Sequence, residues 1–381
     1  MSLSVGIVGL PNVGKSTLFN ALLKRQQAYV ANFPFATIEP NVGVVPVPDE
    51  RLRRLADVIE SETNPSTGST ALTTSPLRVS RPPEVPSIVQ FIDIAGLIAG
   101  AHKGEGLGNK FLSHIREVSA IAHVVRAFSD PDIVKQGVAN PKSDFETIET
   151  ELKLADLQTL EKQKDPGNTP DADLRKKWEV VLKLKDAIQK GIPGRDLELG
   201  EEERKFAKEL SLLTSKPILV VLNVDEGDLK EGNKIEIGFA SSVGIHTSQV
   251  VAISAKIESE LSTLSLVDQE AYLSDLDVRE SGLGRLIKKA FETLGLITYL
   301  TAGVKEVRAW TISKGMNAQE AAGVIHTDFM KNFIKADVCD FDKFVEAPGW
   351  KAARDTGYVR IEGKDYIVKD GEVIEFKIGS G

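Results

Sequence analysis

The residues with the clearest chemical meaning lie near the start of the chain, at Gly9–Ser16, where the sequence is Gly-Leu-Pro-Asn-Val-Gly-Lys-Ser. This spacing matches the phosphate-loop pattern G-x-x-x-x-G-K-[ST], in which two glycines let backbone N–H groups turn inward around a phosphate. The helix that follows directs its positive N-terminus at the same anion. In this pattern Lys15 reaches the β- and γ-phosphates, and the Ser16 hydroxyl ligates Mg²⁺. We therefore predict a nucleoside triphosphate site that begins at this loop.

A second motif, Asp93-Ile94-Ala95-Gly96, has the D-x-x-G form at the end of a predicted strand. At this position Asp93 would hold Mg²⁺ through a water molecule, and the Gly96 N–H would sense the γ-phosphate. Thr37 lies in the loop between the helix after the phosphate loop and the Asp93 strand, which makes it the candidate switch threonine. The predicted metal ligands are therefore Ser16, Thr37 and Asp93.

Two further loops follow predicted buried strands, where the base-reading loops of a GTPase-type fold belong. They are Asn223-Val224-Asp225-Glu226 and Ser254-Ala255-Lys256. The segment Asn233-Lys234-Ile235-Glu236 looks similar, but no buried strand precedes it, so we exclude it. The predicted nucleotide-binding residues are Asn12, Val13, Gly14, Lys15, Ser16, Thr17, Asn223, Val224, Glu226, Ser254 and Ala255.

A sheet must position these motifs, and short apolar runs separated by helical stretches predict a parallel α/β sheet. The predicted strands are Val5–Val8, Val89–Asp93, Ala122–Phe128, Pro217–Leu222 and Val250–Ile253. Residues 141–214 interrupt this pattern with apolar residues at helical spacing and a break at Asp165–Pro170. This favours an inserted antiparallel helical hairpin over a disordered acidic linker. The last 80 or so residues predict a small separate α+β domain.

Composition limits what else the chain does. Its 381 residues exceed one ordinary core, so two or three domains are expected. A net charge of −8 leaves only a local patch for any contact with nucleic acid. The single cysteine, Cys339, excludes a disulfide framework and fits a reducing cytoplasm. The N-terminus does not resemble a signal peptide, and no apolar run approaches the ~20 residues of a membrane span, so we expect a cytoplasmic protein with no membrane partner.

A local basic patch does occur in the helical segment, at Arg175-Lys176-Lys177 with Lys183 and Lys185. One interpretation is a surface that grips RNA. The other is a solvated helix face, which the interleaved acidic residues Glu179 and Asp186 favour.

Taken together, the motifs resemble those of the YchF/Obg-like ATPases, a branch of the translation-factor class of P-loop proteins. The resemblance covers nearly the whole chain and rests on Gly9–Thr17, Asn32–Asn41, Asp93–Leu97, Lys103–Asn109 and Thr301–Trp310. It implies a P-loop GTPase-type nucleotide domain at 1–140 and 215–298, and a helical, coiled-coil-like insertion at 141–214. It also implies a C-terminal TGS domain of the β-grasp type at 299–381, preference for ATP, and association with the ribosome through its large subunit and rRNA. A monomer is expected.

Leu97 occupies the position at which many GTPases carry a glutamine that orients the attacking water. Leucine cannot form that hydrogen bond, so backbone groups, a partner or another side chain must position the water. His102 is one candidate, although a solvated loop histidine is the more ordinary interpretation. Resemblance to cation-dependent relatives implies that Asn12 helps to hold K⁺ beside the phosphates. The predicted catalytic residues are Lys15, Asn12 and Gly96, and Lys135 stands where many relatives carry a histidine.

The base-reading loop bears on which purine binds. GTP-specific sites use Asn-Lys-x-Asp, whereas this chain has Val224 and Glu226 at the lysine and aspartate positions. The longer glutamate would crowd guanine, so ATP is expected to bind at least as tightly as GTP. Three functions remain open: a Mg²⁺-dependent ATPase switch on the ribosome, a conventional Obg-like GTPase, and a nucleotide-gated RNA- or ribosome-binding scaffold whose hydrolysis is incidental.

Overall fold

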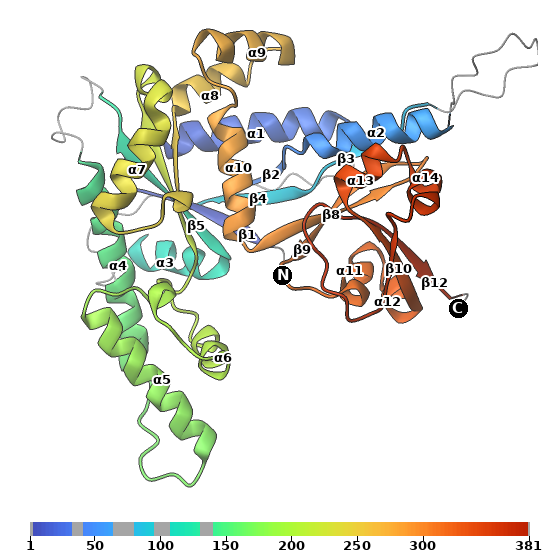
Figure 1. Cartoon of the computed structure of the whole chain (residues 1–381). Coiled ribbons are helices and arrows are strands. Elements are labelled where there is room, and N and C mark those ends of the chain that lie inside the picture. The colour runs from blue at the N-terminus through green and yellow to red at the C-terminus, as the bar shows by residue number, and fades with distance from the viewer. Residues whose placement is uncertain (1–2, 33–40, 64–79, 95–106, 130–139, 380–381) are drawn as a thin grey trace, which may run out of the picture. The chain divides into compact units, whose positions relative to one another are not determined.

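The computed structural model describes residues 3–32, 41–63, 80–94, 107–129 and 140–379 (Figure 1). It divides into two compact units, of which the first comprises residues 1–45 and 89–294 and the second residues 46–88 and 295–381. None of the helices in the described part of the chain combines the length and the apolar character that a membrane span requires.

The first unit is built on a six-stranded sheet in the order β2-β4-β1-β5-β6-β7. β1 pairs in parallel with β4 and β5, β5 with β6, and β6 with β7, as the apolar runs predicted. Because the strands are parallel, the loops after their carboxyl ends gather at one edge of the sheet. The strand bounds are β1 (Ser4–Val8), β2 (Val42–Pro46), β4 (Ile88–Asp93), β5 (Ala120–Ala127), β6 (Ile218–Val224) and β7 (Val250–Ile253).

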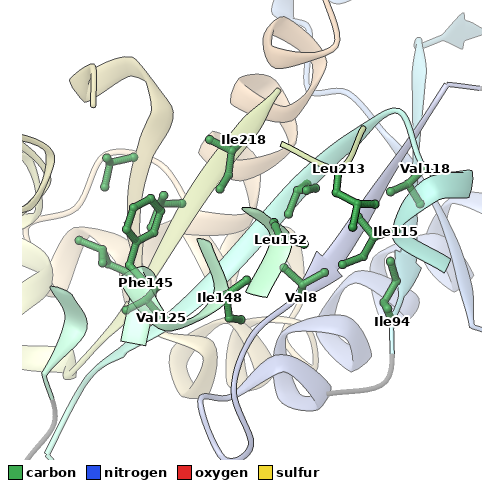
Figure 2. Close-up of a cluster of buried hydrophobic side chains, with 14 of the residues drawn as sticks. Val8, Ile94, Ile115, Val118, Val125, Phe145, Ile148, Leu152, Leu213 and Ile218 are labelled. Carbon is green, nitrogen blue, oxygen red and sulfur yellow. The ribbon is translucent and has the colours of Figure 1, made fainter. Parts of the chain in front are cut away.

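Helices flank this sheet and bury its apolar strands. One core cluster joins side chains of β1, β5, β6 and β7 with α3, α4 and α7, and Figure 2 shows Ile148 and Leu152 of α4 beside Val8 and Val125. Every residue of β1, β6 and β7 is buried, which explains why these strands lack polar alternation. The helices of this unit outside the 141–214 segment are α1 (Lys15–Asn32), α3 (Leu107–Glu117), α7 (Gly232–Val243), α8 (Ala255–Leu261), α9 (Leu266–Asp275) and α10 (Gly282–Thr293).

The helical arm, residues 140–214, contains α4 (Pro141–Glu161), α5 (Ala172–Gln189) and α6 (Glu201–Glu209). Asn140 caps α4 by accepting a hydrogen bond from the Ser143 N–H at 3.1 Å, with proline at the first helical position. The first turns of α4 pack on the sheet, whereas its last turn joins α5 and α6 in a separate apolar cluster. The arm is therefore helical, as predicted, and its α4 belongs to two cores at once.

The second unit contains a six-stranded sheet in the order β11-β10-β12-β8-β9-β3. β12 pairs in parallel with β8, and antiparallel partners flank both, which is the arrangement expected of a β-grasp domain. Its strands are β3 (Glu84–Val85), β8 (Leu296–Ala302), β9 (Val307–Ser313), β10 (Phe333–Cys339), β11 (Arg360–Glu362) and β12 (Val373–Ile378). Its helices are α2 (Glu50–Thr63), α11 (Ala318–Ile325), α12 (Thr327–Lys331), α13 (Phe341–Glu346) and α14 (Trp350–Asp355).

Helix α2 is distant in sequence from the rest of this unit, yet it completes the unit's core. Its apolar face, which includes Leu52 and Leu55, packs with Leu300 and Phe344. An ion pair of 3.0 Å joins Arg51 to Asp370, at the turn before β12. The grouping of residues 46–88 with the C-terminal unit thus differs from the predicted boundaries, which placed this segment in the nucleotide domain. The reason is the apolar stripe of α2, which is buried only in the second unit's core.

Candidate nucleotide-binding site

The phosphate loop connects β1 to α1, and its backbone conformation explains its glycines. Gly14 has φ +95°, and a Cβ atom there would lie 2.3 Å from the Asn223 amide nitrogen. A Cβ atom on Gly9 would lie 2.5 Å from the Val124 carbonyl oxygen of β5. Asn12 adopts φ +61°, a left-handed conformation that asparagine tolerates better than most residues. The strand, loop and helix predicted for this segment are confirmed.

Asn223 ties the phosphate loop to the base-reading loops. Its Nδ2 donates to the Val13 carbonyl at 3.0 Å, and its Oδ1 accepts from the Ala255 N–H at 2.9 Å. The side chain is 6% exposed, so both hydrogen bonds are shielded from water. The structure thus engages both ends of the Asn223 amide in holding two loops together.

Lys15 and Asp93 form the electrostatic centre of the phosphate end. The Lys15 Nζ donates to the Leu10 carbonyl at 2.6 Å. Burial lowers the pKa of Lys15, and the negative charge of Asp93 opposes this change. Burial raises the pKa of Asp93 at the end of β4, and the positive charge of Lys15 opposes this change. A buried lysine with a backbone carbonyl as its hydrogen-bond acceptor is suited to receive a phosphate oxygen.

Oxygen donors suited to Mg²⁺ lie at the same end of the site. Mg²⁺ binds through one or two protein oxygens together with water and substrate phosphates. The Ser16 hydroxyl lines the cavity described below, and Asp93 is a carboxylate that a cation would stabilise in its charged form. Within the described residues there is no group of three or more His, Cys, Asp and Glu side chains that would form an all-protein metal centre. The residues present therefore fit a Mg²⁺ ion that arrives with the nucleotide.

One cavity of about 620 Å³ joins the phosphate loop to both base-reading loops. Of the predicted residues, it brings together Asn12, Gly14, Lys15, Ser16, Thr17, Asn223, Val224, Glu226, Ser254 and Ala255. Val13 does not line it, because its side chain is 2% exposed and packs inward. Thr37 and Gly96, with Leu97, His102 and Lys135, lie outside the described residues, so their predicted roles remain predictions.

Four residues that the sequence analysis did not assign to the site also line this cavity: Phe128, Ser129, Asp225 and Lys256. The Ser129 N–H donates to the Asp225 carboxylate at 2.9 Å, which links the end of β5 to the loop after β6. Asp225 and Lys256 lie inside the two recognised base-loop motifs. Phe128 is the last residue of the predicted strand Ala122–Phe128, which lies beside the Asn223 strand in the sheet. Its position at the carboxyl end of that strand was the feature of the sequence that could have identified it as a site residue.

Val224 and Glu226 differ in how they face the cavity. Val224 is the last residue of β6 and is only 2% exposed, because most of its side chain packs in the sheet core. Glu226 begins the short 3-10 helix η4 (Glu226–Glu231) and is exposed. The excluded segment Asn233–Glu236 lies within α7, where Glu236 accepts from the Ala252 N–H, so it does not belong to the base-reading loops.

The basic patch of the helical arm is largely paired within the arm. Three of its lysines on α5 form ion pairs with glutamates of α6, at 3.1, 2.9 and 2.5 Å: Lys176 with Glu202, Lys177 with Glu209, and Lys183 with Glu203. The ammonium of Lys177 also lies 4.8 Å from the centroid of the Phe206 ring. These pairs agree with the interpretation of a solvated helix face, and they reduce the positive charge that the patch offers to RNA.

A parallel sheet with a phosphate loop after its first strand, and base-reading loops after two others, defines a P-loop nucleotide-binding protein of the GTPase type. A family model described as a 50S ribosome-binding GTPase matches residues 4–160. A second model, for the C-terminal region of YchF GTPases and described as a protein of unknown function (DUF933), matches residues 296–379.

Similar proteins extend this match over the whole chain. The chain is 46% identical to the "Ribosome-binding ATPase YchF" of Bacillus subtilis and 44% identical to that of Pasteurella multocida, with 99% of both chains covered in each case. The solved structure of the Schizosaccharomyces pombe YchF GTPase is similar with a TM-score of 0.82 and 32% identity, covering 99% of this chain and 98% of that one. The chain therefore belongs to the YchF family.

Proposed function

We propose that this chain is a Mg²⁺-dependent ATPase that acts as a nucleotide-switched, ribosome-associated factor in translation. The observation that carries the proposal is the single cavity in which the phosphate loop, Asn223–Glu226 and Ser254–Lys256 meet. A triphosphate at Lys15 and a purine at the base-reading loops are the two ends of one ligand. The names of the relatives, which describe ribosome-binding ATPases, support the hydrolytic and ribosomal parts of the proposal.

The phosphate end divides the chemistry among few residues. Lys15 would hold the β- and γ-phosphates, and Ser16, Thr37 and Asp93 would hold Mg²⁺ directly or through water. Mg²⁺ supplies neutralisation of the charge that develops on the phosphates. By its position in the D-x-x-G motif, the Gly96 N–H would contact the γ-phosphate and make that loop sensitive to hydrolysis. Because Leu97 replaces the water-orienting glutamine, we expect slow intrinsic turnover that a partner raises.

The base end favours adenine. Phe128 presents an aromatic ring among the cavity-lining residues, and a base can stack on such a ring. Glu226 replaces the aspartate that accepts from guanine N1–H and N2–H in GTP-specific sites. If guanine N1–H and N2–H lack an acceptor in the complex, the binding free energy is less favourable by about 1–3 kcal/mol, which corresponds to roughly one to two decades in affinity. Adenine has neither donor, so it escapes this cost, and we propose ATP over GTP.

Asn12 is proposed to hold K⁺ between the β- and γ-phosphates, in place of an arginine finger. It lines the cavity and is exposed, so its amide oxygen is free to face an incoming ion. A monovalent cation there would place positive charge where the transition state gains negative charge.

The partner is proposed to be the ribosome, through its large subunit and rRNA, with the protein monomeric and in the cytoplasm. Lys176, Lys177 and Lys183 are engaged by α6, so the described residues of the patch outside these ion pairs are Arg175 and Lys185. We therefore expect Arg175 and Lys185 to contribute more to a salt-dependent contact with RNA than the three paired lysines.

Parallel titrations with ATP and GTP in the presence of Mg²⁺ test the proposal directly. The expected result is ATP binding at least as tight as GTP, loss of turnover on chelation of Mg²⁺, and faster turnover with added ribosomes. Lys15→Ala is the control, because it removes the cationic side chain of the phosphate loop and should abolish binding or hydrolysis. Tenfold or tighter binding of GTP would identify a conventional GTPase, and unchanged turnover in Lys15→Ala would contradict the P-loop assignment.

A further inference from the structure

Phe128 is the first residue after β5, which ends at Ala127, and several contacts fix its position. The guanidinium carbon of Arg126 lies 5.1 Å from the centroid of the Phe128 ring. The same guanidinium donates from Nε to the Phe128 carbonyl at 3.3 Å. The next residue, Ser129, is held by the Asp225 carboxylate. Ring and backbone of Phe128 are thus restrained together.

In this position the charged guanidinium of Arg126 is buried. It is 8% exposed and lies on β5, in register with Asn223 on β6. Burial raises the pKa of Asp144 in the first turn of α4, and the positive charge of Arg126 opposes that rise. A buried guanidinium is costly unless its interactions compensate it. Among the described residues, three interactions compensate it. They are the cation–π contact with the Phe128 ring, the hydrogen bond to the Phe128 carbonyl and the electrostatic attraction of Asp144.

We propose that Arg126 is a positioning residue for the nucleotide, acting through Phe128. Phe128 lines the cavity and Arg126 does not, so the guanidinium supports the ring from outside the ligand space. A cation against an aromatic ring is attracted by the ring's quadrupole and limits the rotation of the side chain. A ring held in place before binding loses less freedom when a base stacks on it. This inference rests on the proposed function, since it assigns the base end of the same cavity.

From the position of Arg126 we expect its substitution to weaken binding of the nucleotide base but not of the phosphates. We expect Arg126→Ala to weaken ATP binding about tenfold, since it removes a cation–π contact and frees the ring. Inorganic tripolyphosphate, which contacts the phosphate loop without a base, should bind Arg126→Ala and the wild type equally. Arg116→Ala is the matched control, because Arg116 is an exposed arginine of α3 whose guanidinium bonds Thr159. It should bind both ligands as the wild type does.

A double-mutant cycle with Phe128→Ala separates positioning from general stability. If Arg126 acts through the ring, Phe128→Ala and Phe128→Ala with Arg126→Ala should bind ATP with the same affinity. If Arg126→Ala fails to bind tripolyphosphate, Arg126→Met, which retains most of the buried stem, takes its place in the cycle.

Equal ATP affinity of Arg126→Ala and the wild type, or additive losses in the cycle, would overturn the role of Arg126 and leave the proposed function intact. Loss of both ATP and tripolyphosphate in Arg126→Met as well would show a purely structural role and also overturn it. A wild-type protein that binds tripolyphosphate but neither ATP nor GTP would instead overturn the proposed function, and the inference with it.

Discussion

The side-chain amide of Asn223, at the end of β6, donates to the Val13 carbonyl of the phosphate loop at 3.0 Å, across 210 residues of sequence. The other end of the same amide accepts from the Ala255 N–H, at the start of α8. One buried side chain therefore fixes the spacing between the phosphate loop and the loop that begins α8. The glycine at position 14 is required for this approach, because a Cβ atom there would collide with the Asn223 amide.

Asn223→Ala should weaken nucleotide binding and lower the free energy of unfolding together. It leaves the Val13 carbonyl and the Ala255 N–H without their bonds, at about 1–3 kcal/mol for each buried group. Asn223→Asp, which retains an acceptor for Ala255 but places a carboxylate against the Val13 carbonyl, should be at least as damaging to binding. Isothermal titration with ATP and urea unfolding measure the two effects. Wild-type affinity in Asn223→Ala would show that the loops keep their spacing without it.

Val224→Lys combined with Glu226→Asp should move nucleotide preference toward GTP. Aspartate restores the acceptor for guanine N1–H and N2–H, and a lysine stem can cover the base. The change should be incomplete, because Val224 is 2% exposed and a lysine there must redirect its stem out of the sheet core. Parallel affinities for ATP and GTP measure the shift, with Glu226→Asp alone as the control. An unchanged ratio of the two affinities in the double variant would show that another part of the cavity selects the base.

Turnover should be faster in K⁺ than in Na⁺ at equal ionic strength. The expected cause is an ion held by Asn12 beside the phosphates, since Leu97 stands at the sequence position where many GTPases carry a water-orienting glutamine. Steady-state ATP hydrolysis in the two salts measures the difference, and Asn12→Ala should remove it while the Mg²⁺ dependence remains. Equal rates of the wild-type protein in both salts would argue against the ion.

Folding stability should fall in acid through His123. Its ring on β5 is fully buried and stacks on Phe145 with a centroid distance of 5.3 Å, and neither ring nitrogen has a hydrogen-bond partner among the described residues. Burial, with smaller contributions from Arg195 and Lys15, lowers the pKa of His123 from 6.5 to about 3. Below pH 6.5 His123 therefore binds a proton in the unfolded state but stays neutral in the folded state. The free energy of unfolding consequently decreases as the pH falls from 6.5 toward 3.

Between pH 7.5 and 5.5 this difference amounts to about 1.4 kcal/mol. In urea unfolding at both pH values, the free energy of unfolding of His123→Leu should change by about 1.4 kcal/mol less than that of the wild type. Identical pH dependence in His123→Leu and the wild type would mean that the pKa of His123 is the same in the folded and unfolded states, which would contradict the lowered pKa.

Asp156→Ala should destabilise the attachment of the helical arm. The Asp156 carboxylate is 0% exposed and accepts three bonds: from the Leu213 N–H at 2.8 Å, the Thr214 N–H at 2.8 Å and the Thr214 hydroxyl at 2.7 Å. Losing these buried partners should cost about 3–5 kcal/mol of unfolding free energy. Asp156→Asn should cost less, because one acceptor oxygen remains. Asp186→Ala, which removes an exposed pair with Lys190, should change stability by less than about 1 kcal/mol. Denaturant unfolding distinguishes the variants, and a neutral Asp156→Ala would contradict the anchoring role.

Much of the fold and most of the residues that line the cavity could be predicted from local patterns. The phosphate loop is defined by spacing within eight residues, and its strand and helix follow from the residues on either side, so the elements around Lys15 and Ser16 could be predicted. Buried parallel strands are continuous apolar runs, which is why β1, β4, β5, β6 and β7 were predicted close to their observed bounds.

What the sequence by itself determined is therefore each motif and the element that carries it, since both depend on neighbours along the chain. Tertiary structure alone decided which distant segments meet. It joined α2 to the second unit's core, engaged the Asn223 amide between two loops, and placed Phe128 on the wall of the cavity that the phosphate loop also lines. It also paired the lysines of α5 with α6. These outcomes depend on packing and hydrogen bonds between residues tens to hundreds of positions apart, for which a single sequence contains no periodicity or spacing rule.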